Sequence, residues 1–179
     1  PFRNKKAPTK NPWPGLLPMF YYLPKTLEKR ADIVISGQTP PGFMGTHLTT
    51  VRMIPVAHTN HPLNRLKQSL SDQDLQQHRQ IVVRDSGVKR NQDTGWLGAE
   101  QRLTVSHFAQ SIQAIRSGLG FAFIPLHFVE EFIDNGEFKR LKLAVNGDRE
   151  VPIYLTLSTA DREGLAVKAM QENLLLAFK

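Results

Sequence analysis

The feature that most constrains the fold is an alternation of strand and helix patterns between residues 102 and 143. A β-like segment at 103–105 precedes apolar residues at helical spacing, namely Phe108, Ile112, Ile115 and Leu119. Gly118 and Gly120 end this predicted helix, and Phe121–Pro125 has the composition of the next strand. Alternating strands and helices predict an α/β fold with a mostly parallel, helix-covered sheet, or two such sheets.

The same alternation continues on both sides of this block. We expect further strands at 31–36, 47–58, 80–84 and 151–157, and further helices at 126–134 and 164–178. Residues 31–36 are nearly continuously apolar and β-branched, which is typical of a strand buried on both faces. Ser71 followed by Asp72 and Asp74 indicates a helix start, because a serine can cap the helix and acids favour its positive end.

Composition places the chain among globular proteins. Its 179 residues suffice for one large domain or two small lobes, with 40% hydrophobic and 22% charged residues. No apolar run approaches the roughly 18 residues of a membrane helix, so we expect no membrane partner. The absence of cysteine excludes disulfides, thiolate catalysis and cysteine metal sites, and it is compatible with the cytoplasmic location that we expect.

The positive net charge is confined to one end of the chain. Residues 1–30 contain seven basic groups and one acid, which leaves +6, whereas the whole chain carries +7. The other residues are therefore nearly neutral. We interpret the charge as a solvated basic arm and not as a nucleic-acid-binding surface.

Three blocks of sequence resemble the effector domain of LysR-type transcriptional regulators. The first is Leu27–Ser36, which is similar to the family's helix-to-strand segment with its Ala-Asp pair. The second is Met53–Leu63, with a His-Pro-Leu turn, followed by Leu70–Leu75 and Ile81–Val83. The third and most specific is Val105–Pro125, a capped helix that ends in Gly-Leu-Gly before a strand that ends in proline.

The resemblance covers about residues 16–178 and implies the fold of type II periplasmic binding proteins. In that fold, two Rossmann-like α/β lobes are joined by crossover strands. By analogy, lobe I contains residues 1–50 and 160–179, and lobe II contains residues 51–159. The family's opening strand is not readable here, and neither is its N-terminal helix-turn-helix. We therefore expect contact with DNA only through a domain outside this chain.

The resemblance also implies a small-molecule site in the cleft between the lobes. Strand ends and helix N-termini in such a cleft present N–H groups and hydroxyls to a ligand. The matching positions are Ser36, Gly37, Gln38, Thr49, Arg84, Asp85, Ser86, Thr104, Ser106 and His107. Arg84 is suited to binding a carboxylate, although Asp85 beside it is a competing partner. Simpler interpretations remain open, with Ser106 as an ordinary helix cap and Asp85–Gly87 as an ordinary turn.

Other chemistries find little support. His58 and His61 lie where a strand ends at Pro62, without a third ligand nearby, so we expect no metal ion. Ser86 lacks the motif and the base partner of a hydrolase nucleophile. Gly118–Gly120 ends a helix and does not open one, which is unlike a dinucleotide-binding loop. We expect no catalytic residue, no cofactor and no enzymatic activity.

The leading hypothesis is a regulatory domain that binds a small effector, such as an organic or aromatic acid, between two lobes. A homodimer or homotetramer would transmit this binding to the DNA-binding domains. An extracytoplasmic solute-binding receptor is the main alternative, because it shares the fold class. An enzyme on a related bilobal scaffold is the third, and it requires a converging acid–base set that the sequence does not show.

Overall fold

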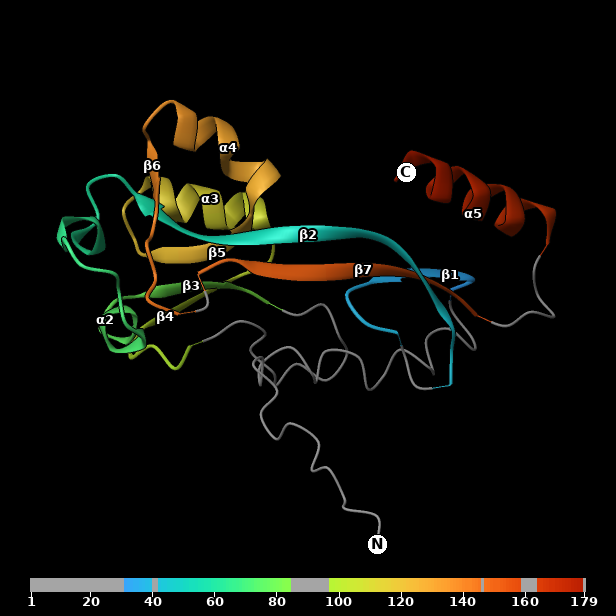
Figure 1. Cartoon of the computed structure of the whole chain (residues 1–179), viewed down its shortest axis with the longest axis horizontal. Coiled ribbons are helices and arrows are strands. Elements are labelled where there is room, and N and C mark those ends of the chain that lie inside the picture. Colours follow the sequence, from blue (N-terminus) through green and yellow to red (C-terminus); the bar gives the residue numbers. More distant parts are fainter. Residues whose placement is uncertain (1–30, 40–41, 85–96, 146, 159–163, 179) are drawn as a thin grey trace, which may run out of the picture.

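The computed structural model describes residues 31–39, 42–84, 97–145, 147–158 and 164–178. Among these, seven strands form one mixed sheet in the order β1-β7-β2-β5-β3-β4, and β6 pairs with β2 outside this path (Figure 1). The strands are β1 (Ile33–Ser36), β2 (Gly45–His58), β3 (Gln80–Val83), β4 (Arg102–Val105), β5 (Phe121–Pro125), β6 (Phe138–Arg140) and β7 (Arg149–Leu157). The helices are η2 (Pro62–Arg65), α2 (Asp72–Gln76), α3 (Phe108–Arg116), α4 (Leu126–Asp134) and α5 (Leu165–Ala177), of which η2 is a 3-10 helix.

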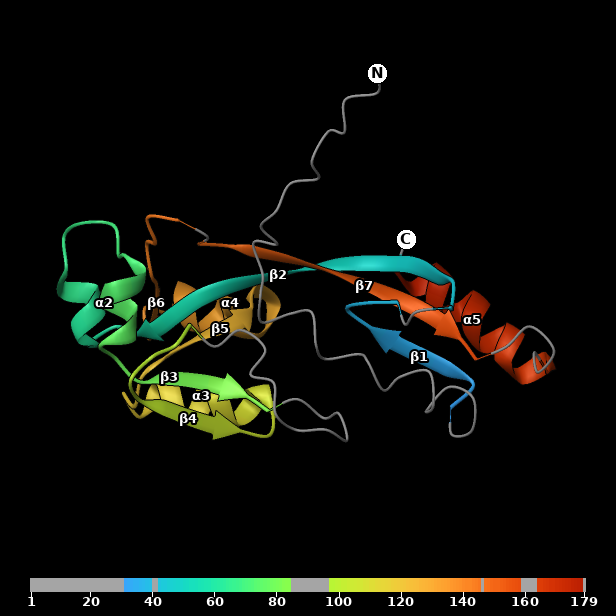
Figure 2. The ribbon, with the colours of Figure 1, turned by 90° about the horizontal axis from the view of Figure 1, so that it is seen from below.

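Two long strands connect the ends of the molecule. β2 and β7 pair antiparallel, from Gly45 opposite Thr156 to Met53 opposite Arg149. Beyond this pairing, β2 continues and pairs with β5 and β6, whereas β7 pairs with β1 near its other end. Figures 1 and 2 show the pair running between a larger group, which includes β3, β4, β5 and α2 to α4, and a smaller group with β1 and α5.

The prediction of a mostly parallel sheet is wrong for the described residues. Only the pairs β3–β4 and β3–β5 are parallel, whereas the pairs made by β2 and by β7 are antiparallel. The reason is that β2 and β7 run in opposite directions between the two ends. Local strand–helix alternation correctly predicts the parallel unit, but the direction of the connecting strands depends on partners far away in sequence.

The predicted burial of residues 31–36 on both faces is also wrong. Within the described part of the chain β1 pairs with β7 alone, and it ends the path of the sheet. The side chain of Ile35 is 50% exposed. The β-branched residues of this segment therefore reflect strand propensity and not complete burial.

β5 is the strand around which both hydrophobic cores assemble. Ala122 and Ile124 face one core, where they pack with residues such as Ile115 of α3 and Val129 of α4. Phe121 faces the other core, and Phe123 packs against that core. The remaining buried members of this second core include Leu63, Leu70, Leu75 and Leu141. Successive side chains of a strand point to opposite faces of a sheet, so both faces of β5 are covered.

The start of α2 is set by the capping residues that the sequence shows. Ser71 caps α2, and its hydroxyl accepts a hydrogen bond from the Asp74 N–H at 3.3 Å. The Asp74 carboxylate in turn accepts one from the Ser71 N–H at 2.8 Å. This reciprocal capping box confirms the predicted helix start.

The turn between α3 and β5 requires two glycines. Gly118 has a φ of 70°, a left-handed conformation that favours glycine at the end of a helix. At Gly120 the constraint is space, because an added Cβ would lie 2.2 Å from the carbonyl oxygen of Arg79. That oxygen accepts a hydrogen bond from the Phe121 N–H at 3.1 Å. Gly120 therefore allows β5 to start directly against the segment that leads into β3.

We predict that Gly120→Ala destabilises the chain by about 1–3 kcal/mol, because the backbone near Arg79 must move to accommodate the new methyl group. Urea unfolding measures the effect. Gly147→Ala is the matched control, since the nearest atom to its Cβ is Leu143 Cβ at 3.9 Å. Equal stability losses in the two variants would contradict the steric argument.

Candidate functional site

The carboxyl ends of the parallel strands β3 and β4 bring two predicted site residues together. Val83 is paired with Val105, and the Arg84 N–H donates to the Val105 carbonyl at 2.7 Å. One guanidinium N–H of Arg84 donates to the Ser106 hydroxyl at 3.3 Å, and both side chains are exposed. A cation and a hydroxyl thus meet at the edge of the sheet where α/β proteins generally bind ligands.

The N-terminus of α3 begins at the same edge, one residue later than predicted. His107 is the N-cap, and it makes no side-chain capping hydrogen bond. The interpretation of Ser106 as the helix cap is therefore wrong. The Ser106 N–H instead donates to Gln110 Oε1 at 2.8 Å, which displaces the helix start to His107. Without a side-chain cap, the first turn of α3 presents partial positive charge toward an anion.

The other predicted residues near this edge differ in their surroundings. Thr104 is exposed on β4, and its hydroxyl accepts a hydrogen bond from Arg102 Nε at 2.8 Å. His107 is exposed at the start of α3. Asp85 and Ser86 lie outside the described residues. The structure thus places Arg84 and Ser106 in direct contact, with His107 adjacent in the chain.

A second group of predicted residues, Ser36 to Gln38, lies at the end of β1 and directly after it. The Ser36 hydroxyl donates to the Gln38 carbonyl at 2.6 Å and so closes a local turn. Gly37 packs closely on β7, because an added Cβ would lie 3.3 Å from Val151 Cγ1. Among the hydrogen bonds of the described residues, none joins this turn to Arg84 or Ser106.

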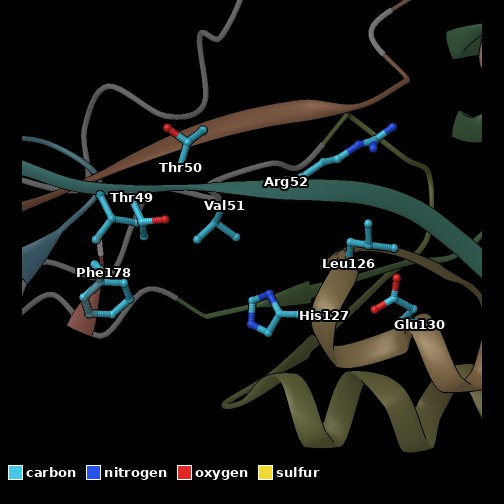
Figure 3. A pocket seen from close by; sticks show the side chains of 9 residues that line it. Thr49, Thr50, Val51, Arg52, Leu126, His127, Glu130 and Phe178 are labelled. Atoms are coloured by element: carbon cyan, nitrogen blue, oxygen red, sulfur yellow. The ribbon is translucent and has the colours of Figure 1, made fainter. Parts of the chain in front are cut away.

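Thr49 belongs to a cavity of about 490 Å³ along β2 (Figure 3). Its lining residues come from β2, α4, β7 and the end of α5, and they are Thr49, Thr50, Val51, Arg52, Leu126, His127, Glu130, Ile153 and Phe178. Of the predicted site residues that are described, only Thr49 lines it. His127 and Glu130 were not among the predicted site residues, although their three-residue spacing at a helix start places both on one helical face.

His58 and His61 have structural roles. His61 is buried, and its Nδ1 accepts a hydrogen bond from the Leu63 N–H at 3.2 Å. Its ring packs edge-on against His78, with centroids 5.2 Å apart. Burial, together with the charges of His78 and His58, lowers the pKa of His61 from 6.5 to about 4. The described residues include no group of three or more His, Asp or Glu side chains arranged to hold a metal ion.

The fold defines the class of protein. A sheet built on two long antiparallel strands, with an α/β unit attached, is the periplasmic-binding-protein-like fold that the resemblance implied. The family described as LysR substrate binding domain matches residues 22–178. The chain belongs to this family.

Individual relatives agree with this assignment. The probable HTH-type transcriptional regulator YhaJ of Escherichia coli (strain K12) is 33% identical over 115 residues, which are 62% of this chain and 39% of YhaJ. The chain thus spans about two fifths of the length of this curated relative. The uncharacterized HTH-type regulator YeeY of the same strain is 28% identical over 112 residues, 60% of this chain and 36% of YeeY.

Solved structures share the fold at low sequence identity. The CcmR regulatory domain of Synechocystis PCC6803, in complex with 2-PG, has a TM-score of 0.65 and 13% identity, covering 89% of this chain and 79% of that domain. Full-length LysG of Corynebacterium glutamicum, with bound effector Arg, has a TM-score of 0.62 and 16% identity, covering 86% of this chain and 53% of LysG. As for membranes, the helices in the described ranges are too short or too polar to span one.

The pKa of His61 predicts a pH dependence of folding. Because the folded chain holds this pKa at about 4 and the ordinary value is 6.5, the unfolded chain binds more protons between these values. The free energy of unfolding should fall as the pH drops through this window, by at most about 1.4 kcal/mol per pH unit for one group. Urea unfolding at about pH 7 and about pH 5 measures this loss.

The variant His61→Asn tests the assignment, since asparagine retains an acceptor for the Leu63 N–H but does not titrate. We expect a smaller loss of stability on acidification in this variant than in the original chain. If the variant and the original chain lose the same stability, His61 is not the titrating group.

Proposed function

We propose that this chain is the ligand-sensing domain of a LysR-type transcriptional regulator that acts in the cytoplasm. It binds a small metabolite between its lobes, and a homodimer or homotetramer transmits the binding to DNA-binding domains elsewhere in the protein. Membership of the family supports this proposal. YhaJ is described as a probable HTH-type transcriptional regulator, and the LysG structure contains a bound effector. Both descriptions agree with the proposal.

The observation that carries the proposal is the contact between Arg84 and Ser106 at the carboxyl edge of β3 and β4. An arginine presents several N–H donors in a geometry that matches a carboxylate. The hydroxyl of Ser106 and the uncapped first turn of α3 add further donors and a partial positive charge. These groups favour an anionic ligand such as an organic or aromatic acid.

The contact is also weak enough to be exchanged for a ligand. The distance from Arg84 to Ser106 is 3.3 Å, at the long end of the range for a hydrogen bond, and both side chains face solvent. A carboxylate that takes the place of this contact gains charge-assisted hydrogen bonds at little cost. The site therefore offers donors suited to a carboxylate, and a bound carboxylate can replace the contact between Arg84 and Ser106.

The proposed transmission depends on the division into lobes. We assign residues 1–50 and 160–179 to lobe I and residues 51–159 to lobe II, so that the first boundary falls within β2 and the second follows shortly after β7, which pairs with β1 of lobe I. The Ser36–Gln38 turn belongs to lobe I, and Arg84 and Ser106 belong to lobe II. A ligand that contacts both the Ser36–Gln38 turn and Arg84 would bind one arrangement of the two lobes more tightly than another. A ligand shifts the populations of two conformations only when its affinity for them differs in this way.

Two other functions make different predictions. An extracytoplasmic solute-binding receptor shares the fold and also binds a small molecule, but its full gene would encode a secretion leader in place of a helix-turn-helix. An enzyme would consume the compound that it binds. The curated relatives favour the regulator, because both YhaJ and YeeY are described as HTH-type regulators.

The test is a thermal-shift screen of the chain against a panel of metabolites rich in organic acids, with mass spectrometry of each compound. We expect stabilisation that increases with ligand concentration and no product. Arg84→Gln should weaken binding of a stabilising acid at least about tenfold, since hydrogen bonds to charged groups contribute about 1.5–3 kcal/mol.

Arg79→Gln is the matched control, because Arg79 precedes the opposite end of β3 and bonds to the Gln101 side chain at 3.0 Å. It removes the same charge from the same region but not from the site. Binding that is equally weak in both variants would point to a general effect of charge. A panel without any stabilising compound would contradict the sensing function, and a consumed compound would indicate an enzyme.

A further inference from the structure

We infer that the cavity between β2, α4 and the end of α5 is a second small-molecule site, which takes an amphipathic cation: an amine or guanidinium attached to an apolar or aromatic body. The proposal does not depend on the anion site at Arg84, because neither Arg84 nor Ser106 lines this cavity. Three features support this site: the size of the cavity, its apolar walls, and two polar side chains that form no hydrogen bond or ion pair with the described residues.

The cavity is large enough for a metabolite. Its volume of about 490 Å³ lies within the roughly 300–1,000 Å³ typical of ligand pockets. Residues of β2 and β7 line it, and Figure 1 shows that α4 and α5 lie on the same side of these two strands. Side chains from four elements that are distant in the sequence therefore surround one space.

Apolar side chains form much of the wall. Val51, Leu126 and Ile153 come from β2, α4 and β7, and Phe178 completes the wall just after α5. Phe178 is 48% exposed, so part of its ring surface is open to a ligand. A ligand with a flat apolar body would cover this ring.

Two exposed polar side chains of α4 line the cavity. His127 and Glu130 are one helical turn apart, and Figure 3 shows His127 extending from α4 toward Phe178. The His127 ring lies against Phe128, with centroids 4.3 Å apart. In the described part of the chain, neither the His127 nor the Glu130 side chain makes a hydrogen bond or an ion pair.

The charge of the cavity favours a cation. Arg52 is the positively charged lining residue; its Nε lies 2.7 Å from Oδ2 of Asp148, a carboxylate that it shares with Arg140, and Figure 3 shows its guanidinium extending away from His127 and Phe178. Glu130 is the carboxylate that lines the cavity, and no described side chain forms an ion pair with it. The face of the Phe178 ring also attracts cations, so two independent groups select the same sign.

An anion is the opposing possibility, because the N-terminus of α4 has no side-chain cap. The positive end of a helix attracts negative charge over its first turn. Glu130 lies within one and a half turns of this end and would repel an anion that entered the cavity. We therefore assign the ammonium or guanidinium group to the space between His127 and Glu130, and the apolar body to Val51 and Phe178.

Binding here would connect two helices that the described residues leave apart. None of the described side chains of α5 is buried, and α4 belongs to the other end of the β2–β7 pair. A molecule in contact with both Phe178 and His127 would restrict α5 relative to α4. The cavity is thus placed to tune the relative position of the two ends of the sheet independently of the anion site.

The test uses three probes that share an indole ring with a two-carbon side chain and differ in the charge of the terminal group. Tryptamine is the cation, tryptophol is the neutral alcohol and indole-3-acetate is the anion. Each is titrated into the ¹⁵N-labelled full chain and followed by NMR. We expect tryptamine to bind more tightly than tryptophol and indole-3-acetate, with shifts centred on Thr49, Val51, His127 and Phe178.

Glu130→Gln should weaken tryptamine binding about fivefold and leave tryptophol binding unchanged, because an exposed ion pair contributes up to about 1 kcal/mol. Glu131→Gln is the matched control: it removes the same charge from the next residue of α4, which does not line the cavity. No tryptamine binding at millimolar concentration, tighter binding of indole-3-acetate, or equal losses in the two variants would each overturn the proposal.

Discussion

The antiparallel pairing of β2 with β7 is the constraint on which the rest of the structure depends. β2 alone contributes 14 residues and, at about 3.3 Å per residue, extends for about 45 Å. β1 has no other partner among the described strands, and β5 and β6 reach the sheet through the far end of β2. Breaking this pairing would detach one group of elements from the other.

Local sequence signals predicted most of the individual elements. Apolar spacing, the Ser71 capping residues and the glycines around Leu119 gave correct types for α2, α3, α4 and the strands β2 to β5 and β7. These signals act between residues close in the chain, where propensity and capping decide the outcome. The strand directions and the exposure of β1 depend on contacts between residues about 100 positions apart, which no local pattern encodes.

In the candidate site, too, some features follow from local sequence signals and others depend on long-range contacts. The contact between Arg84 and Ser106 could be anticipated, since both residues follow strands that the sequence predicts, and parallel strands end at one edge of a sheet. The shift of the α3 start to His107 could not, because it depends on how Gln110 bonds to the Ser106 backbone. The cavity was also not predictable, since Val51, Leu126, Ile153 and Phe178 meet only through the tertiary fold.

The alternation of β5 between two cores has a consequence for how this part of the protein unfolds. Phe121 and Ile124 belong to different clusters, yet three peptide units are all that separate them. Solvent cannot enter one cluster by displacing β5 without also opening the other. The two layers therefore form a single cooperative unit, and a molecule that holds either face in place slows the opening of both.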